Sequence, residues 1–390
     1  MKKLSVLILA SLVFALFGPV TFSQAARENG ARKIVVFDGQ ALNDAAKDEL
    51  VARAGGVKIK NLNLIGGMAV YLPSKAAEKA LLLESGVLRI DDDVEVTALR
   101  KTAPAQPAEV LPWGVDRIDA DLAWGTTTGD PVKVAILDTG IDLTHPDLAA
   151  NVKGGVNTIY PLKSPNDDNG HGTHVAGIIA AQDNEIGVIG VAPKADLYAV
   201  KVLSRTGSGY LSDIIEGLDW SIQNKMQVVN MSLGTSSNVP SFYDAIKRAY
   251  QAGIVLVAAA GNDYGGAVNY PAAYPEVIAV SATGDNDQIA SFSSVGPQVD
   301  LAAPGASIYS TYKGSTYKTL SGTSMASPHV AGAAALVLNT AVGAYDLDGD
   351  YAWDPNEVKN KLEATAENLG LTVPNNLYGF GLVDAEKAVL

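Results

Sequence analysis

The sequence lacks cysteine altogether, so no disulfide bond can brace the fold and no thiolate is available as a metal ligand. It is also poor in positive charge: 29 lysine and arginine residues stand against 42 aspartate and glutamate residues, for a formal net charge of −13. Because binding to nucleic-acid phosphates needs a basic face, this balance argues against a nucleic-acid partner. It favours solubility and the binding of cations instead.

Beyond the N-terminal segment, the sequence also has no apolar run long enough to suggest a membrane-spanning helix. There, Lys2 and Lys3 precede the apolar run LSVLILASLVFALF, and the small residues of SQA follow it. This pattern predicts a secretion signal over 1–25, cleaved after Ala25. The run falls short of the roughly 20 residues that span a bilayer, so we expect a secreted protein with no stable membrane span. Since secreted proteins are usually braced by disulfides, bound metal ions become a reasonable alternative reinforcement here.

Residues 32–100 carry a pattern of their own. RKIVVFD predicts a strand, LNDAAKDELVARAGG predicts a helix closed by glycine, and VKIKNLNLIGGMAVYLP predicts two strands. SKAAEKALLLESG predicts a second helix with Ser74 as its N-cap, and VLRIDDDVEVTAL predicts a last strand. This β-α-β-β-α-β order is typical of a small ferredoxin-like α+β domain.

The proline-rich segment RKTAPAQPAEVLP follows and predicts an exposed linker, which is the best domain boundary in the chain. We therefore expect a signal over 1–25, a first domain over 26–107 and a second domain over 108–390. In the second domain, short runs rich in Val and Ile, such as VKVAILD and IVLVAAAGN, alternate with amphipathic stretches. This alternation predicts an α/β fold with a mostly parallel sheet and helices on both faces.

Three residues at the ends of predicted elements are candidates for chemistry. Asp138 ends the strand VKVAILD, and His171 precedes the apolar helix of NGHGTHVAGIIAA. Ser324 lies at the start of the helix in SGTSMASPHVAGAAALVL, because Pro328 is tolerated only near a helix start. Taken singly, Asp138 fits a turn, His171 fits a surface residue or a weak HGTH metal pair, and Ser324 fits an N-cap.

Together these residues fit nucleophilic catalysis. A serine hydroxyl is a poor nucleophile until an imidazole takes its proton, and the imidazole needs a carboxylate to orient it. A helix N-terminus adds backbone N–H groups that face a developing oxyanion. The chain order Asp, His, Ser, with the serine in GTSMA, differs from the Ser, Asp/Glu, His order and G-x-S-x-G elbow of α/β-hydrolases.

The motifs AILDTGID, GHGTHVAG and GTSMASPHVAG resemble, in order, the three catalytic signatures of the subtilisin-like serine proteases. The similarity runs from about Leu111 to the C-terminus. It implies that Asp138 orients His171, that His171 is the general base and acid, and that Ser324 is the nucleophile. The segment VLVAAAGND resembles the one that supplies an oxyanion-stabilising side chain in that family, which assigns this role to Asn262.

The resemblance also implies how a substrate binds. The family holds an extended peptide between two edge segments by backbone hydrogen bonds, and one further segment lines the pocket for the side chain before the scissile bond. In the family, the residue before a Tyr-Pro pair forms the floor of this pocket, and Asn269 is the matching residue here. We therefore expect a broad preference for medium-sized apolar side chains before the scissile bond. The matching residues are Ser208, Gly209 and Tyr210, then Ser232, Leu233 and Gly234, and finally Ala259, Ala260 and Gly261 along the wall.

The first domain resembles the propeptide of the same family, which assists folding and then inhibits the product. A parallel sheet with many non-local contacts folds slowly, and a folding template relieves this difficulty. The resemblance implies that the enzyme cuts its own chain in the linker over 101–110, and we place the cut after Gln106 or Pro107.

The resemblance also implies a calcium site, because residues of this chain match the positions of the family's calcium ligands. The family uses a loop after the histidine helix, a carboxylate after the aspartate strand and a residue near the mature N-terminus, and all the matching groups are oxygen donors. Asp183 and Glu185 depart from the usual neutral residues of this loop and raise its negative charge, and an ordinary surface loop remains the alternative. The implied ligands are Glu109, Asp147, Gln182, Asn184 and the carbonyls of Ile186 and Val188.

The stretch DLDGDYAWDPNE is a second candidate for calcium. Counted from Asp346, its acidic residues fall at positions 1, 3, 5, 9 and 12, the ligand spacing of an EF-hand loop, but Tyr351 stands at position 6, where glycine is usual. The alternative is a helix start, because the Asp-Pro pair suits an N-cap and the first helical position. The candidate ligands are Asp346, Asp348, Asp350, Asp354 and Glu357.

The sequence thus favours a secreted, calcium-stabilised serine endopeptidase that acts on protein and peptide substrates, carries its own propeptide as a bound inhibitor and needs no organic cofactor. We expect a monomer. Two alternatives from other classes are a catalytically silent binding protein and a different serine hydrolase such as an esterase. Retention of all four catalytic residues argues against the first, and the peptide-binding edge segments argue against the second.

Overall fold

The structure, a computed structural model, describes residues 30–38, 42–98, 101–102 and 110–390. The predicted secretion signal over 1–25 and the expected cut after Gln106 or Pro107 lie outside the described residues. No helix in the described part is long and apolar enough to cross a membrane. The chain divides into two compact units: the smaller comprises Met1–Asn61 and Gly66–Asp92, and the larger comprises Leu62–Ile65 and Asp93–Leu390.

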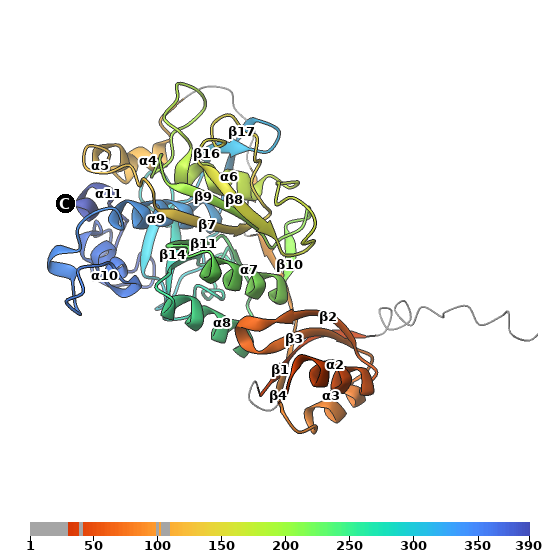
Figure 1. The fold of residues 1–390 in the computed structure, drawn as a ribbon. Helices are drawn as coiled ribbons and strands as arrows, with labels where there is room; N and C mark the ends of the chain where they lie inside the picture. Colours follow the sequence, from red (N-terminus) through yellow and green to blue (C-terminus); the bar gives the residue numbers. More distant parts are fainter. Residues whose placement is uncertain (1–29, 39–41, 99–100, 103–109) are drawn as a thin grey trace, which may run out of the picture. The chain divides into compact units, whose positions relative to one another are not determined.

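The smaller unit is a four-stranded antiparallel sheet with two helices (Figure 1). The strand order β2-β3-β1-β4 is that of the ferredoxin-like fold predicted from the sequence. Ser74 caps the second helix as expected, since its hydroxyl accepts a hydrogen bond from Ala77 N at 3.2 Å. The elements are β1 (Ala31–Phe37), α2 (Asp44–Arg53), β2 (Val57–Leu62), β3 (Gly67–Leu72), α3 (Lys75–Leu82) and β4 (Val87–Asp92). The short helix η1 (Asn63–Ile65), between β2 and β3 in the chain, belongs to the larger unit.

The larger unit is built on a seven-stranded sheet in which every neighbouring pair is parallel. Strands such as Val255–Ala259 are apolar and buried along their whole length, because helices cover both faces of the sheet. The predicted α/β fold class is therefore confirmed. In sheet order the strands are β15 (Leu301–Pro304), β14 (Val277–Thr283), β13 (Val255–Ala259), β11 (Val228–Met231), β7 (Lys133–Asp138), β9 (Asp196–Lys201) and β8 (Val152–Asn157).

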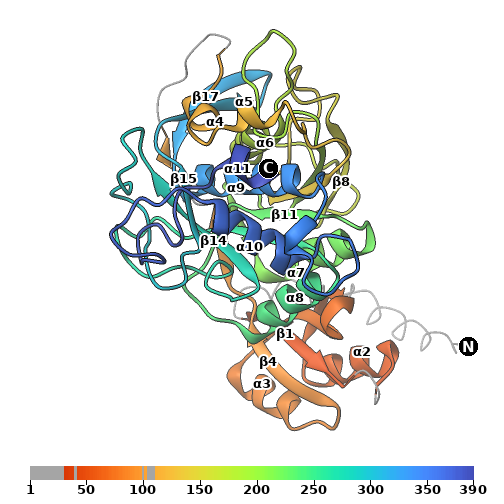
Figure 2. The ribbon, with the colours of Figure 1, turned by 90° about the vertical axis from the view of Figure 1, so that its left-hand side faces the viewer.

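The helices of the larger unit form two layers. Helices α6 and α9 pack against each other on one face of the sheet, while α7 and α8 pack together on the other (Figure 1). The C-terminal helix α11 lies beside α9 (Figure 2). The helices are α4 (Trp113–Arg117), α5 (Ala120–Ala123), α6 (His171–Ala180), α7 (Leu211–Gln223), α8 (Pro240–Gln251), α9 (Thr323–Val337), η2 (Gly343–Tyr345), α10 (Pro355–Thr365) and α11 (Ala385–Val389).

Helix α9 runs through the core, and all of its residues are buried. It begins at Thr323, close to Ser324 as expected, but Pro328 stands in the second turn rather than the first. Since proline has no N–H, it leaves the carbonyl of the residue four positions earlier, Ser324, without its helical partner. The hydroxyl of Ser232 supplies the missing hydrogen bond at 2.8 Å, which makes the proline tolerable at this position.

Two small sheets complete the larger unit. In one, β5 (Glu95–Ala98) lies between β10 (Ser208–Tyr210) and β12 (Leu233–Gly234). The other has the order β16-β17-β6 and consists of β16 (Ile308–Tyr312), β17 (Thr316–Ser321) and β6 (Lys101–Thr102).

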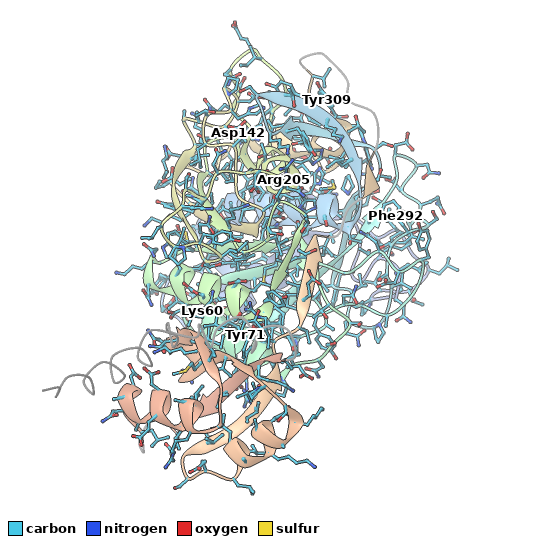
Figure 3. All side chains as sticks on the ribbon, turned by 90° about the vertical axis from the view of Figure 1, so that its right-hand side faces the viewer. Lys60, Tyr71, Asp142, Arg205, Phe292 and Tyr309 are labelled. Carbon is cyan, nitrogen blue, oxygen red and sulfur yellow. The ribbon has the colours of Figure 1, made fainter. Side chains whose placement is uncertain are left out.

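The β16–β17 hairpin is fastened to the loop that follows β7. The carboxylate of Asp142, labelled in Figure 3, accepts hydrogen bonds from Gly314 N at 2.8 Å and Ser315 N at 3.1 Å in the turn of the hairpin. Burial alone would raise the pKa of Asp142, but these hydrogen bonds and those from Thr144 outweigh it and lower the pKa. The hairpin is thereby held on the same side of the molecule as the end of β7.

Truncation of a core side chain of α9 tests this packing. We expect Leu336→Ala to lower the free energy of unfolding by about 2–5 kcal/mol, because Leu336 is fully buried and its removal leaves a cavity. The matched control Leu371→Ala removes the same atoms from a side chain that is 106% exposed and should leave stability unchanged. Urea unfolding provides the measurement, in a Ser324→Ala background because the sequence predicts that Ser324 is the nucleophile of a protease, and equal midpoints for the two variants would contradict the packing.

Candidate active site

Asp138 and His171 form the centre of the site. Asp138 is the last residue of β7, and His171 is the first residue of α6. Both side chains are fully buried, and His171 Nδ1 lies 2.8 Å from each carboxylate oxygen of Asp138. Asp138 Oδ1 also accepts a hydrogen bond from Thr139 N. A carboxylate in this position fixes the ring orientation and favours the tautomer with the proton on Nδ1.

The backbone donors at the buried N-terminus of α6 all have acceptors. His171 N donates to Asn169 Oδ1 at 3.1 Å, Gly172 N to Thr139 Oγ1 at 2.9 Å, and Thr173 N to Asp167 Oδ2 at 3.0 Å. His174 N donates to the carbonyl of Gly170 at 3.1 Å. The first N–H groups of a helix have no acceptor within the helix. Here the loop before α6 and Thr139, which follows β7, supply the acceptors and thereby fix where His171 lies.

Asp167 holds this arrangement together. Its carboxylate is 4% exposed, and its Oδ1 accepts from Thr139 Oγ1 at 2.9 Å and from the backbone N–H groups of Asn169 and Gly170 at 2.8 Å each. Its Oδ2 accepts from Thr173 N and, at 2.6 Å, from Thr173 Oγ1. One carboxylate therefore ties the loop, the first turn of α6 and the residue after Asp138 into a single unit.

Ser324 is the second residue of α9 and is fully buried. Its hydroxyl donates to the carbonyl of Ser232 at 3.2 Å, and its own carbonyl accepts from the Ser232 hydroxyl. Asn230 extends this network, since it donates to Ser232 Oγ at 2.9 Å and accepts from Ser327 Oγ at 2.7 Å. The chain around Ser324 is thus fixed by side chains of the neighbouring strand β11 and the residue after it.

His171 Nε2 is buried and has no hydrogen-bond partner among the residues that the structure describes. The hydroxyl of Ser324 is directed to the carbonyl of Ser232 and makes no hydrogen bond to His171. The two residues stand at the N-termini of α6 and α9, which pack against each other. The structure therefore contains an oriented imidazole with a free nitrogen and a serine at a helix start, but not the serine–histidine hydrogen bond itself.

Asn262 lies directly beside the start of α9. Its Oδ1 accepts hydrogen bonds from Thr323 N at 2.9 Å and Thr323 Oγ1 at 3.1 Å, so its Nδ2 is the group that remains to donate elsewhere. Thr323 Oγ1 in turn accepts from Gly261 N at 3.1 Å. Thr323, the residue before Ser324, therefore joins the start of α9 to the segment after β13.

The two edge segments predicted to bind substrate do bind an extended peptide, which is a stretch of the same chain. Strand β5 pairs antiparallel with β10 on one side and with β12 on the other, and Thr97 pairs with both Ser208 and Gly234. Val96, opposite Gly209, is 1% exposed. Backbone pairing of this kind is how a groove recognises an extended segment by strand addition.

Asn269 is anchored beside the segment that leads to Asn262. Its backbone N–H donates to the carbonyl of Ala260 at 2.8 Å, and its Nδ2 donates to Asp263 Oδ2 at 2.9 Å. A Cβ atom placed on Gly261 would lie 2.6 Å from Asn269 Nδ2 and 2.7 Å from Ser294 Oγ. Asn269 therefore fills the space behind Gly261 with a fixed polar group.

Most of the expected ligands of the first calcium site lie in one hydrogen-bonded loop. Asp147 is buried; its Oδ2 accepts from Val188 N at 2.9 Å and its carbonyl accepts from Gln182 N at 2.9 Å. Asn184 Oδ1 accepts from Ile186 N at 3.1 Å. Glu109 lies outside the described residues.

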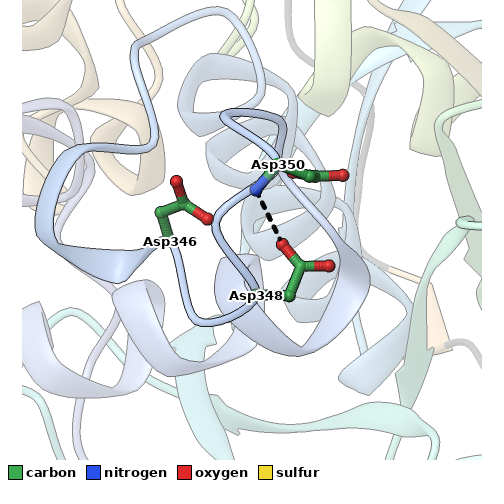
Figure 4. Close-up of side chains that lie close together, drawn as sticks. All are labelled: Asp346, Asp348 and Asp350. Atoms are coloured by element: carbon green, nitrogen blue, oxygen red, sulfur yellow. Dashed lines mark hydrogen bonds between the residues drawn. The ribbon is translucent and has the colours of Figure 1, made fainter.

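The acidic stretch after α9 brings three of its five candidate ligands together. Carboxylate oxygens of Asp346, Asp348 and Asp350 lie within 4.8 Å of one another (Figure 4). Asp354 and Glu357, which were expected to join them, instead form a capping box at the start of α10, and Glu357 is fully buried and also accepts from Leu347 N at 2.6 Å. A capping box satisfies the backbone donors at a helix start, so it accounts for these two carboxylates by itself.

The remaining histidines of the HGTH motif and α9 belong to the core. His174 Nε2 lies 2.9 Å from the carbonyl of Lys318, and burial lowers the pKa of His174 to about 3. Burial also lowers the pKa of His329 to about 4. Both rings are therefore neutral, and the hydrogen bonds of His174 to backbone carbonyls explain it without a metal.

Several positioning residues were not predicted from the sequence. Asp167 stands four positions before His171, and an acidic residue just ahead of a helix start is itself a capping signal. Thr139 and Thr323 directly adjoin Asp138 and Ser324, but a single threonine carries no signal of its own. Ser232 was predicted only as part of a substrate-binding edge, whereas it also pairs with the backbone of Ser324.

Comparison with known proteins agrees with this geometry. A family model described as "Subtilase family" matches residues 129–381. The alkaline protease of Alkalihalobacillus alcalophilus is 48% identical over 310 residues, which cover 79% of this chain and 76% of that protein. Subtilisin Savinase of Lederbergia lenta is 50% identical over 282 residues, 72% of this chain and 99% of its own length. Subtilisin NAT of Bacillus subtilis subsp. natto is 40% identical over 399 aligned positions, 99% of each chain.

Asp167→Asn tests the positioning of His171. The amide keeps the shape of the carboxylate but replaces one acceptor oxygen by a donor, so the start of α6 should shift, and kcat on a chromogenic peptide should fall by about tenfold to a hundredfold. KM should change little, because Asp167 does not line the peptide groove. The control Asp285→Asn alters an exposed aspartate in a turn and should leave both constants unchanged. An equal loss in kcat and affinity, or no loss at all, would contradict a positioning role.

Proposed function

This chain belongs to the subtilase family and is a serine endopeptidase, and on that premise we propose that Asp138, His171 and Ser324 form its catalytic triad. The observation that carries the proposal is the buried Asp138–His171 pair, in which one ring nitrogen is held by the carboxylate and the other is unpartnered among the described residues. An imidazole in this state is prepared to accept a proton.

The proposed reaction has two halves. The hydroxyl of Ser324 turns from the carbonyl of Ser232 to His171 Nε2, and its oxygen attacks the carbonyl carbon of the scissile bond while His171 takes the proton. Asp138 stabilises the imidazolium that forms. His171 then gives the proton to the departing amine, which leaves an acyl group on Ser324. Water, activated by His171 in the same way, releases this acyl group and restores the serine.

The oxyanion of each tetrahedral intermediate needs hydrogen-bond donors that are already in place. Asn262 Nδ2 and the backbone N–H of Ser324 are the proposed donors. The fixed orientation of Asn262 by Thr323 supports this assignment, because a donor that is held before the reaction needs no reorganisation during it. In related serine proteases, loss of one such side-chain donor costs about 2.7–4 kcal/mol of barrier stabilisation.

We propose extended protein and peptide segments as the substrates. The pairing of β5 with both β10 and β12 supports binding by backbone hydrogen bonds. The hydrogen bond from Gly261 N to Thr323 Oγ1, which joins the segment Ala259–Gly261 to the residue before Ser324, supports a side-chain pocket lined by this segment. Since Asn269 fills part of this region with a polar amide, we propose a preference for medium-sized rather than large aromatic side chains before the scissile bond.

We propose that the protein is made as a secreted, monomeric precursor that processes itself. The N-terminal charge pattern supports export, and the ferredoxin-like fold of the smaller unit supports a role as folding template. The occupation of the groove by β5 supports inhibition, because a strand already paired with β10 and β12 keeps other peptides out.

Calcium is the proposed stabilising ion. The loop that contains Gln182, Asn184 and Val188 offers carbonyl and amide oxygens next to the buried carboxylate of Asp147, and such a set of oxygens suits Ca²⁺. Asp346, Asp348 and Asp350 offer a second set, and Tyr351 adopts a positive φ of 62° at the position where an EF-hand loop turns on glycine. A bound ion would stabilise the folded state only, with no part in the chemistry.

Removal of the nucleophile tests the triad. Ser324→Ala should abolish both the digestion of casein and labelling by a fluorophosphonate, with a loss in kcat of about a millionfold, the size of effect known for this change in related enzymes. The control Ser315→Ala alters a serine in the exposed turn of the β16–β17 hairpin and should retain both signals. Digestion of casein by the Ser324→Ala variant would end the proposal.

Replacement of Asp346, Asp348 and Asp350 by asparagine tests the second calcium site. If these carboxylates hold an ion, free calcium at about a hundred times its dissociation constant stabilises the protein by about 2.7 kcal/mol, and the triple variant loses this protection. Rates of thermal inactivation with calcium and with EGTA provide the measurement. An unchanged difference between the two conditions would show that the stretch is only a capped loop. Replacement of Asp116, Asp130 and Asp285 by asparagine, three exposed aspartates outside both proposed calcium sites, is the charge-matched control.

A further inference from the structure

A buried lysine that the proposed reaction does not use lies beside Asp138. Lys201 is the last residue of β9 and is 4% exposed. In the parallel pairing of β7 with β9, Asp138 and Lys201 are partners in register. Ile136 and Ala199, two positions earlier on each strand, belong to the core cluster that includes α6. Because alternate residues of a strand share one face, the side chains of Asp138 and Lys201 also leave the sheet on the side of α6.

The ammonium group of Lys201 is fixed by three oxygen atoms. Its Nζ donates to the carbonyl of Thr139 at 2.6 Å, to Asp168 Oδ1 at 2.7 Å and to the carbonyl of Leu203 at 3.2 Å. The side chain of Asp168 is 52% exposed, so solvent screens this ion pair. Thr139 is fully buried, so water does not reach its carbonyl to replace Lys201.

All three polar groups of Thr139 have partners. Its N–H donates to Asp138 Oδ1 at 2.6 Å, and its Oγ1 donates to Asp167 Oδ1 at 2.9 Å. Its carbonyl accepts from Lys201 Nζ. Since the N–H and the carbonyl belong to one residue, the hydrogen bond to Lys201 also fixes the direction of the N–H that meets the Asp138 carboxylate.

The backbone of Asp138 is fastened to the same strand end. Val202 N and Leu203 N both donate to the carbonyl of Asp138, at 2.9 Å and 3.0 Å. The residues that end β9 and follow it thus hold the backbone of Asp138 directly and its carboxylate through the ammonium of Lys201. A rotation of this carboxylate would turn His171, whose Nδ1 lies 2.8 Å from each of its oxygens.

Stability alone does not account for a charge at this position. An ammonium group is costly to remove from water, and well-packed apolar residues in place of a buried ion pair often give equal or greater stability. Leu197 and Ala199, the earlier residues of β9 on this face, are apolar and fully buried. A cation at the end of this apolar row, level with Asp138, therefore indicates a task at the site beside it.

We propose that Lys201 is a positioning residue for the reaction. Its ammonium holds the carbonyl of Thr139, which keeps the N–H of Thr139 on the Asp138 carboxylate and so keeps His171 in its hydrogen bond. Because Lys201 is buried, it acts through these residues and not on the substrate. The inference rests on the proposed catalytic triad.

Lys201→Met tests this role. The variant keeps an apolar side chain of similar length but leaves the buried carbonyl of Thr139 without its donor. We expect kcat on a chromogenic peptide to fall by about tenfold to a hundredfold, with KM little changed, because the peptide groove is untouched. Rates are expressed per active site, counted by fluorophosphonate titration, so that unfolded chains do not contribute. A wild-type kcat, or a rise in KM as large as the fall in kcat, would overturn the proposal.

Lys359→Met is the matched control. Lys359 Nζ lies 2.8 Å from Asp300 Oδ1, and its side chain is 20% exposed, so the variant also removes a partly buried, paired ammonium. It should leave kcat unchanged whatever it does to stability. A loss of kcat equal to that in Lys201→Met would show a general effect of losing such a charge and would overturn the proposal.

Two further variants separate the contacts of Lys201. Asp168→Asn removes the ionic partner and leaves the hydrogen bond to Thr139, so kcat should be retained; a loss as large as that in Lys201→Met would overturn the route through Thr139. Lys201→Arg keeps a cation, but its planar donors do not match the same three oxygens, so we expect a smaller loss of kcat than in Lys201→Met. If Lys201→Met does not fold, a wild-type kcat in Lys201→Arg would overturn the proposal.

The hydrogen bond itself gives a second measurement. In the full-length Ser324→Ala chain with isotope-labelled histidine, the NMR signal of the proton on His171 Nδ1 reports the bond to Asp138. Lys201→Met should shift or broaden this signal, because the carboxylate is no longer held in one orientation, and Lys359→Met should not. An unchanged signal in the folded Lys201→Met chain would overturn the proposal.

Asp138→Asn separates this inference from the proposed triad. It should lower the rate of casein digestion by about ten-thousandfold, the size of effect known for this change in serine proteases with such a triad. Full activity of Asp138→Asn would contradict the triad, and the role of Lys201 with it. A large loss in Asp138→Asn beside a wild-type kcat in Lys201→Met would overturn the role of Lys201 alone.

Discussion

The larger unit depends on the satisfaction of backbone donors at two buried helix starts. Helices α6 and α9 both begin in the interior, where water cannot reach the first N–H groups, and an unpaired buried donor costs roughly 1–3 kcal/mol. At α6 the acceptors are Asn169, Thr139 and Asp167; at α9 the first donor is met by Asn262. The groups that satisfy these helix starts are the neighbours of His171 and Ser324, so the requirement for hydrogen bonds also fixes the two residues proposed to react.

The same arrangement holds the two residues proposed to react before any substrate binds. His171 is the first residue of α6 and Ser324 is the second residue of α9, and each is held by groups from a different strand or loop. Pro328 adds to this effect, because it frees the carbonyl of Ser324 to accept from Ser232 and so ties the helix start to the edge of the groove. Loss of the Asp167 carboxylate alone would therefore disturb several hydrogen bonds together. In this way Asp167 would affect the proposed reaction through the position of His171, without contact with the substrate.

Features that lie within contiguous residues were predictable, and features that depend on tertiary pairing were not. The parallel sheet, the ferredoxin-like unit, the Ser74 cap and the start of α9 follow from local periodicity and capping chemistry. The capping of α10 by Asp354 was foreseen as an alternative to metal binding, because an Asp-Pro pair is typical of a helix start. The part of Glu357 in the capping box was not foreseen. The hydrogen bond between Thr139 and Asp167, the pairing of β5 with β10 and β12 and the pairing of β6 with β17 join residues far apart in the chain, and composition carries no record of them.

Strand register separates two sources of selectivity in the groove. Backbone pairing with β10 and β12 accepts any extended segment, because every residue other than proline offers the same N–H and carbonyl groups. A segment of this chain is aligned by Asp93, whose carboxylate accepts from Ser212 N at the start of α7, so the anchor chooses its position before any side chain is read. A peptide from another protein brings no such anchor, and its alignment must come from side-chain pockets such as the one proposed beside Gly261 and Asn269. A groove of this kind can therefore be strict toward its own chain and broad toward others, since the strictness resides in the tether and not in the groove.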